Sequence, residues 1–305
     1  MPQAPPPADA AEHLVAIVVL NHNRCEMLLQ CLTTLDRLHW RHRVTVVVDN
    51  ASSDGSVAAA RAGFPHVVVI DQPINLGVAG GRNAGLAWIV ENHCPRHVLF
   101  IDDDTLLEPD AVHAMARAAD TGEDIAIVAP KAYRRPGERR LISAGGMRFN
   151  PYLGAAWDVG SGELDTGQHD EPLDIEACPG FAFFVRTDMF GRIGGFDERL
   201  NPYGWEDVEL SLRARRAGYR IVYAPDAVVY HLGGRIGRGP VAAYERYKAR
   251  NMLRLLRRHA TMVQLLCFVL LLPPRAVLRI GRELASGNWR VVRAWIMGLV
   301  RSPQR

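Results

Sequence analysis

The chain of 305 residues has few cysteines and no secretory signature. Its five cysteines are scattered and include no C-x-x-C pair, which predicts reduced thiols in a cytosol-facing protein. The first residues, MPQAPPPADAAEHL, contain neither a basic segment nor an apolar core, unlike a signal peptide. We expect residues 1–13 to form a disordered tail rich in Pro and Ala.

Long hydrophobic runs are also missing. A helix that spans a bilayer needs roughly 18 to 20 apolar residues, and no stretch of this sequence reaches that length. The nearest candidate, residues 262–272, contains Gln264 and is followed by Pro273-Pro274. We expect this segment to stop at the prolines and to be too short to cross a bilayer alone.

Two common nucleotide-binding signatures are absent as well. The glycine-rich segment at residues 75–85, NLGVAGGRNAG, matches neither G-x-G-x-x-G nor G-x-x-x-x-G-K-[ST]. The dinucleotide-binding and P-loop classes therefore lose their main support.

The charge is distributed very unevenly along the chain. The net charge is only +3, but residues 235–305 carry 15 basic and 2 acidic residues, so the preceding part is strongly acidic. With 48% hydrophobic and 23% charged residues, the composition is that of a core-forming protein. We expect one α/β domain over residues 14–238 and a separate basic helical region over residues 239–305.

Five runs rich in Val and Ile, separated by helix-length segments, predict an α/β domain with a mainly parallel sheet. They are residues 14–20, 44–48, 66–70, 97–101 and 124–128. Most of them end in polar or acidic residues, and ligands bind beyond the carboxyl ends of the strands in such sheets. The following stretch, 131–175, has no periodicity and predicts a loop region. A helix at 206–217 and strands at 220–223 and 227–230 come after it.

Paired carboxylates follow the fourth predicted strand. Asp102 and Asp104 point to the same side of an extended strand end, where they can hold Mg²⁺ or Mn²⁺ together with a substrate diphosphate. The alternative is that these acids cap the next helix. His231, at the end of AVVYH, is a candidate third ligand, although a lone His is more often a hydrogen-bonded structural residue.

Other polar residues follow the second and third predicted strands. A carboxylate at Asp49 can accept the imide N–H of a pyrimidine, as acids accept base amino groups; an Asx turn or a cap is the alternative. Arg82, at the start of a helix with many small residues, can bind a phosphate or base oxygen. The alternative for those glycines is close packing of the helix on the sheet.

Glu206 and Asp207 begin a predicted amphipathic helix. Acids in a first turn complement the helix dipole, and the dipole also favours the ionised carboxylate that a general base must have. Trp205 precedes them, and we expect an exposed ring there that could pack on a sugar.

Seven motifs, taken in order over residues 14–258, resemble those of the family 2 glycosyltransferases, in particular bacterial rhamnosyl- and galactofuranosyltransferase-like enzymes. They are VVLNHNR, VVDNASSDGS, NLGVAGGRNAG, FIDDDT, GFAFFVR, GGFDERL and GWEDVELSLRARRAGYRIVYAPDAVVYH. The resemblance implies a GT-A fold, a nucleotide-sugar donor and inversion at the anomeric carbon. His22 stands where the family more often has an aromatic residue.

The resemblance also implies roles for individual residues on the donor side. Asp49 would bind the pyrimidine, and Asn75 and Arg82 would line the nucleotide site. Asp102 and Asp103 would contact the donor.

The same resemblance assigns the metal and the acceptor side. Asp102 and Asp104 form the D-x-D motif, which would hold Mn²⁺ or Mg²⁺ together with His231. Asp207 would be the catalytic base, with Trp205 and Glu206 near the acceptor.

The sequence therefore predicts an inverting transferase that uses dTDP-rhamnose or a UDP-sugar. Its acceptor would be a glycan or lipid-linked hydroxyl in cell-surface polysaccharide synthesis, and no nucleic acid partner is expected. A sugar-nucleotide nucleotidyltransferase is one alternative, but it would need a glycine-rich loop with a Lys where this chain has NHNR. A catalytically silent GT-A binding protein would lose Asp207 or the Asp pair, and neither is lost.

The basic C-terminal region has the pattern of a membrane-surface helix. Residues 244–260 combine apolar positions at helical spacing with six basic residues, and Trp289 and Trp295 follow. Each basic residue near an anionic surface contributes roughly 1 kcal/mol. We expect peripheral association with the cytoplasmic face of the cell membrane. Packing on the α/β domain, or on a second copy in a homodimer, is the alternative.

Overall fold

The computed structural model describes residues 12–233 and 241–300. Most of the predicted N-terminal tail, residues 1–11, lies outside the described residues. Glu12 and His13 are bonded to the domain: the Glu12 carboxylate accepts the backbone N–H groups of Arg41 and His42, and the His13 ring contacts His97.

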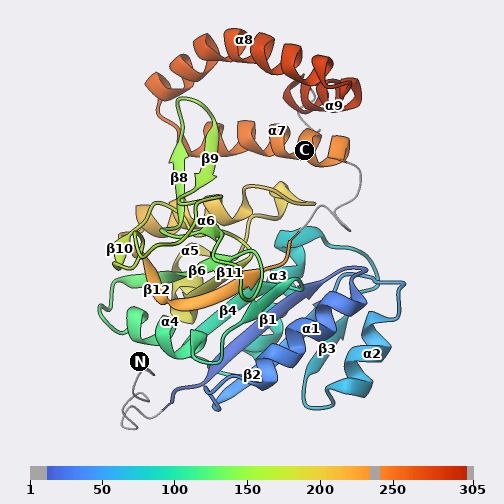
Figure 1. The fold of residues 1–305 in the computed structure, drawn as a ribbon, viewed down its shortest axis with the longest axis vertical. Coiled ribbons are helices and arrows are strands. Elements are labelled where there is room, and N and C mark those ends of the chain that lie inside the picture. The colour runs from blue at the N-terminus through green and yellow to red at the C-terminus, as the bar shows by residue number, and fades with distance from the viewer. Residues whose placement is uncertain (1–11, 234–240, 301–305) are drawn as a thin grey trace.

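A ten-stranded sheet forms the centre of the molecule (Figure 1). Its main path is β10-β12-β6-β11-β4-β1-β2-β3, in which β3, β2, β1 and β4 run parallel and β11 is antiparallel to both of its neighbours. The strands on this path are β1 (Val15–Asn21), β2 (Arg43–Asp49), β3 (Val68–Asp71), β4 (His97–Asp102), β6 (Ile125–Tyr133), β10 (Leu173–Asp174), β11 (Ala182–Arg186) and β12 (Arg220–His231). Two short strands, β5 (Thr105–Leu107) and β7 (Leu141–Ser143), pair with β12 and β6. All five predicted Val/Ile-rich strands are confirmed.

Helices cover both faces of this sheet, which explains why its strands are apolar on both sides. Within β1, Val15, Ile17 and Val19 pack with one hydrophobic cluster, whereas Ala16 and Val18 pack with the other. The first cluster includes residues of α1 (Cys25–Asp36), α2 (Ser56–Gly63) and α4 (Ala111–Ala119). The second includes residues of α3 (Gly77–Asn92), α5 (Thr187–Ile193) and α6 (Glu206–Arg216). The predicted α/β class with a mainly parallel sheet is confirmed.

The stretch 131–175 is more regular than predicted. Besides β7 and β10 it contains an antiparallel hairpin of β8 (Met147–Asn150) and β9 (Ala155–Asp158). These strands are short and only partly buried, so they carry no strong hydrophobic pattern. The two strands predicted near the end of the domain are one strand, β12, with an irregularity between Ala224 and Val228.

Three helices form a separate layer beyond the sheet: α7 (Val241–His259), α8 (Met262–Ala285) and α9 (Trp289–Val300) (Figure 1). The first of them packs on the α/β domain. Leu255 and Leu256 of α7 join a third hydrophobic cluster with Trp205, and the Asn251 amide donates to the backbone carbonyls of Tyr203 and Gly204. For α7, the structure therefore agrees with the alternative that the C-terminal helices pack on the α/β domain.

The prediction that the apolar segment stops at Pro273-Pro274 is wrong. Helix α8 begins with a Thr261–Gln264 capping box and continues through both prolines for 24 residues. Its best window has a mean hydropathy of 1.7 and is 6% buried, which makes α8 the one described helix long and apolar enough to cross a membrane. Prolines within a helix remove hydrogen bonds and bend it, and α8 is curved in Figure 1.

Candidate active site

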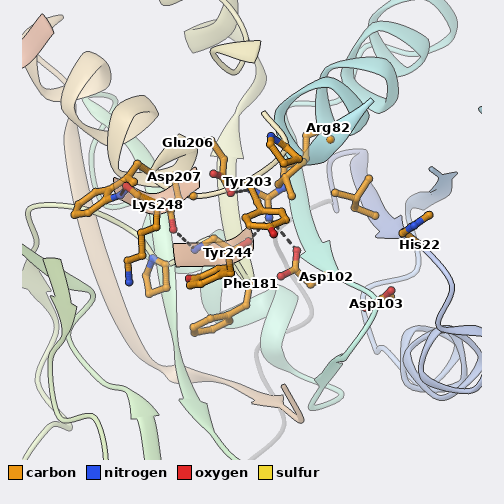
Figure 2. Close-up of a pocket in the computed structure, with 18 of the residues that line it drawn as sticks. His22, Arg82, Asp102, Asp103, Phe181, Tyr203, Glu206, Asp207, Tyr244 and Lys248 are labelled. Atoms are coloured by element: carbon orange, nitrogen blue, oxygen red, sulfur yellow. Dashed lines mark hydrogen bonds and ion pairs between the residues drawn. The ribbon is translucent and has the colours of Figure 1, made fainter. Parts of the chain in front are cut away.

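A cavity of about 620 Å³ opens beyond the carboxyl ends of β1 and β4, at the edge where the sheet predicts a ligand site (Figure 2). Its walls come from separate parts of the chain: the end of β1, the start of α3, the Asp102–Asp104 segment, the start of α6, the β8–β9 hairpin and α7. Asp102 and Asp103 lie toward one side of the view, and Asp207 and Lys248 toward the other.

Asp102, Asp104 and His231 lie together, as the sequence predicts. One ligand atom from each lies within 4.8 Å of the others. The Oδ1 atom of Asp104 and the Nε2 atom of His231 are 3.3 Å apart, and both are buried without a hydrogen-bond partner among the described residues. Buried polar atoms normally have partners, so these two atoms fit a cation bound between them. The three residues could hold Mn²⁺ or Mg²⁺.

Arg24, at the end of the NHNR segment, neutralises part of this acidic cluster. Its Nη1 atom lies 3.0 Å from Oδ1 of Asp103 and 2.5 Å from Oδ2 of Asp104. Burial raises the pKa of Asp103 to about 7 in spite of Arg24. Burial also acts to raise the pKa of Asp104, but His231 and Arg24 outweigh it and lower that pKa. Arg24 was not singled out in the sequence, although a basic residue that closely follows a predicted parallel strand indicates a possible site residue.

Arg82 links the two sides of the cavity. Its side chain is buried and donates to Oδ1 of Asp102 at 2.9 Å and to the carbonyl of Gly180. Its Nη1 atom lies 3.7 Å from the Glu206 carboxylate. We expected Arg82 to face the donor; it lines the cavity but is held between Asp102 and Glu206. It therefore supplies positive charge to both carboxylate groups.

Glu206 and Asp207 lie at the start of α6. The backbone N–H of Gly180 donates to Oδ2 of Asp207 at 2.9 Å, and that of Val208 donates to Oδ1 at 2.8 Å. Burial, with the charge of Asp207, raises the pKa of Glu206 to about 7; burial also raises the pKa of Asp207 against these donors. The two backbone bonds make Asp207 the better stabilised anion of the pair.

The expectation of an exposed Trp205 is wrong. Trp205 adopts a left-handed backbone conformation with φ of 77°, and its side chain is packed in the third hydrophobic cluster at 7% exposure. Its indole N–H donates to the backbone carbonyl of Lys248. It still forms part of the cavity wall, where the stacked rings of Tyr203 and Tyr244 also lie, 5.3 Å apart.

Asp49 and Asn75 have different positions relative to the cavity. Asp49 is fully buried, accepts from the Asn21 amide and from the backbone N–H of Ser52, and is not among the cavity-lining residues. Asp49 therefore does not line the cavity, whereas its neighbour Asn50 does. Asn75 lines the cavity, as predicted.

Two charged residues of the wall were not singled out in the sequence. Asp158 ends β9, in the stretch predicted as a loop, and Lys248 is on α7, which was assigned to a membrane surface. Their positions depend on long-range packing of the hairpin and of α7. No local pattern indicates such packing.

The family model for glycosyl transferase family 2 matches residues 16–191, more than half of the chain. Among curated proteins, the chain is similar to the N-acetylglucosaminyl-diphospho-decaprenol L-rhamnosyltransferase of Mycobacterium tuberculosis, with 26% identity over 81% of this chain and 85% of that protein. It is also similar to a galactofuranosyltransferase of Mycolicibacterium smegmatis, with 25% identity over 75% of this chain and 38% of that protein.

Two solved structures show the fold. GalNAc-T7 with UDP, GalNAc and Mn²⁺ has a TM-score of 0.64 and 15% identity, covering 82% of this chain and 48% of that one. A mannosyltransferase of Pyrobaculum calidifontis in complex with GDP-Man and Mn²⁺ has a TM-score of 0.57 and 17% identity, covering 94% and 86%. The predicted GT-A fold is confirmed, and the family match shows that the chain belongs to glycosyltransferase family 2.

Proposed function

We propose that this chain transfers a sugar from a nucleoside-diphosphate donor to an acceptor hydroxyl with inversion at the anomeric carbon. The observation that carries the proposal is the arrangement of two groups in one cavity. Asp102 and His231, which with Asp104 form a cluster that fits a divalent cation, and the Glu206–Asp207 pair line the same space (Figure 2). A transferase needs both, one for the leaving diphosphate and one for the attacking hydroxyl.

Asp102, Asp104 and His231 would hold Mn²⁺ or Mg²⁺ on the donor side. A divalent cation bound there neutralises the charge that develops on the departing diphosphate. Arg24 keeps Asp103 and Asp104 in place through its two short contacts. Both solved relatives carry Mn²⁺ with a nucleotide, which supports this choice of ion.

Asp207 would take the proton of the acceptor hydroxyl as its oxygen attacks the anomeric carbon. The Gly180 and Val208 N–H groups fix both carboxylate oxygens of this base. Attack on one face while the diphosphate leaves from the other inverts the configuration. Glu206, next to the base and 3.7 Å from Arg82, lies at the boundary of the two halves.

The named relatives support a choice of substrates. The rhamnosyltransferase is similar over most of both chains, so we propose dTDP-rhamnose as the donor, with UDP-sugars as the alternative. Its name gives a sugar on a polyprenyl diphosphate as acceptor, and we propose an acceptor of that class for this chain. Such acceptors belong to cell-surface polysaccharide synthesis on the cytoplasmic side of the membrane.

The exposed side of α8 supports peripheral attachment to that membrane. Met262, Leu266, Leu270 and Leu278 are each at least 60% exposed, while Phe268, on the opposite side, is buried. Two contacts also fix the C-terminal half of the helix. Arg275 donates to the carbonyl of Leu153, and Arg279 binds Glu245 of α7. A helix fixed in this way, with one apolar side and nearby arginines, lies in the membrane interface.

The basic surface is smaller than the sequence suggests. On α7, Arg250 and Arg254 donate to backbone carbonyls of the α/β domain, and Arg258 binds Asp197 and Glu209. These arginines hold α7 in place. The exposed arginines left for an anionic surface among the described residues are Arg257 of α7, Arg282 of α8, and Arg290 and Arg293 of α9.

Replacing the base tests the catalytic role. We expect Asp207→Asn to lower the rate of transfer by about 10²- to 10⁴-fold while leaving nucleotide affinity nearly unchanged. Released nucleoside diphosphate gives the rate, calorimetry gives the affinity, and the exposed-site variant Asp188→Asn is the matched control. Because burial raises the pKa of Asp207, activity of the unmodified chain should rise with pH above the ordinary carboxyl range. A folded Asp207→Asn variant with normal turnover would refute the assignment.

Metal removal tests the donor side. We expect binding of UDP or dTDP to require Mn²⁺ or Mg²⁺, and His231→Ala and Asp104→Asn each to weaken the metal-dependent part of that binding. Calorimetry with and without chelator measures it. His66→Ala is the control, because that exposed ring pairs with Asp36 and does not line the cavity. If neither the chelator nor the substitutions change the affinity for the nucleotide, the metal site is refuted and His231 is a structural residue.

Flotation with liposomes tests the membrane proposal. The full chain should float with anionic liposomes at low salt, less with neutral ones, and Leu270→Glu with Leu278→Glu should reduce flotation strongly. Val90→Glu, at an exposed apolar position of α3, should have no effect. If the unmodified chain stays at the bottom with anionic liposomes, the proposal fails. A concentration-dependent dimer lost in the same double variant would then assign α8 to contact with a second copy.

A further inference from the structure

Two charged side chains of the cavity, Asp158 and Lys248, have no part in the reaction as proposed so far. We propose that they bind the acceptor: Asp158 accepts a hydroxyl of the acceptor sugar, and Lys248 binds a phosphate group attached to that sugar. The inference rests on the proposed function, because it takes the Asp207 side of the cavity as the acceptor side.

Both residues belong to the Asp207 side. In Figure 2, Lys248 lies toward the same side of the view as Asp207, and Asp102 and Asp103 lie toward the other side. Asp158 lies within electrostatic reach of Asp207: burial and the negative charge of Asp207 raise its pKa to about 6, while a hydrogen bond from Ser143 and the charges of His231 and Lys248 oppose this rise. Asp158, Asp207 and Lys248 therefore form one group of charges.

Asp158 has an unused acceptor atom. Its Oδ1 atom is buried and has no hydrogen-bond donor among the described residues. An unpaired buried carboxylate oxygen is costly, and native structures normally supply a partner. Since the residue lines the cavity beside the base, a sugar hydroxyl that enters to reach Asp207 is well placed to donate to it.

Lys248 is the accessible one of the chain's two lysines. Lys131 is 3% exposed and pairs with Asp165 and Asp170. Lys248 is exposed, and no described carboxylate forms an ion pair with its ammonium group; its recorded neighbour is the Tyr244 ring, 5.7 Å away. Carbonyls and carboxylates of the α/β domain engage Arg250, Arg254 and Arg258 of the same helix. Lys248 is the basic residue of α7 that lines the described cavity.

A phosphate is the group that this ammonium would bind. A lysine ammonium acts as a compact point charge with three donors, which suits phosphate oxygens. The donor diphosphate is expected at Asp102 and Asp104, on the other side of the cavity. A phosphate at Lys248 would therefore belong to the acceptor.

The same wall continues to the exposed apolar helix. A Cβ at Gly154, in the turn of the β8–β9 hairpin, would lie 2.7 Å from Sδ of Met252 and 2.8 Å from Cε2 of Phe268, so the turn fits closely against α7 and α8. The hairpin thus runs from Asp158 at the cavity to α8, as Figure 1 shows. An acceptor in which a sugar, a phosphate and a lipid follow one another matches this wall. The sugar would contact Asp158, the phosphate Lys248 and the lipid α8.

Lysine labelling tests the contact without using activity. In the full chain, N-hydroxysuccinimidyl acetate should acetylate Lys248 and spare Lys131, as read by mass spectrometry of peptides. Farnesyl-diphosphate-linked N-acetylglucosamine should slow acetylation of Lys248 at least about tenfold. The methyl glycoside of the same sugar, at equal concentration, should not. Equal rates with and without the phosphorylated probe at saturating concentration would overturn the Lys248 assignment.

Kinetics of two near-isosteric variants test both residues. We expect Lys248→Met and Asp158→Asn each to raise KM for the acceptor about 10- to 100-fold, the range for a lost hydrogen bond to a charged group, with KM for the donor and slow hydrolysis of the donor unchanged. Asp226→Asn, at an exposed carboxylate outside this cavity, is the control.

The outcomes separate the two levels of the account. If the unmodified chain neither transfers nor hydrolyses any nucleotide sugar, the proposed function fails. If it transfers normally and the variants keep the acceptor KM, or raise the donor KM instead, the assignment of Asp158 and Lys248 fails while the proposed function stands.

Discussion

The site depends on the compensation of negative charge in a confined space. The Asp102–Asp104 segment, Asp158 and the Glu206–Asp207 pair all face or adjoin one cavity, where burial and mutual repulsion oppose ionisation. Arg24 offsets part of this charge at Asp103 and Asp104. Arg82 offsets another part between Asp102 and Glu206. The raised pKa values of Asp103, Asp158 and Glu206 show that the compensation by protein groups is incomplete. A site built in this way could hold a divalent cation at Asp102, Asp104 and His231.

Two parts of the fold form the two sides of the cavity. The parallel strands place the donor-side residues at their carboxyl ends, which is a property of the α/β architecture itself. The acceptor side is assembled from elements packed on that sheet: the start of α6, the β8–β9 hairpin and α7. Because α7 also carries α8 and α9, the layer that completes the cavity is the one that presents an apolar surface. The proposed recognition of the acceptor and the proposed attachment to a membrane would thus share one structural unit.

The sequence predicts most of what local patterns determine. Strand composition identifies the sheet, and residue spacing together with the family resemblance identifies the cluster of Asp102, Asp104 and His231. What it missed depends on contacts between distant segments: α7 covers Trp205, which makes a residue expected at the surface a core residue. Asp49 is likewise buried and accepts hydrogen bonds from Asn21 and Ser52, which no local pattern indicates. The continuation of α8 through two prolines was missed because proline usually ends a helix. The sequence pattern does not indicate that this helix bends and continues.

A crystal structure of the chain with dTDP or UDP and Mn²⁺, with the ion located by its anomalous scattering, is the most direct measurement of the central claim. The account predicts a single manganese peak in contact with Asp102, Asp104 and His231 and with the diphosphate, while Asp207 stays free of the nucleotide on the other side of the cavity. A manganese ion bound elsewhere, or a nucleotide whose diphosphate contacts Asp207 in place of the metal cluster, would contradict it.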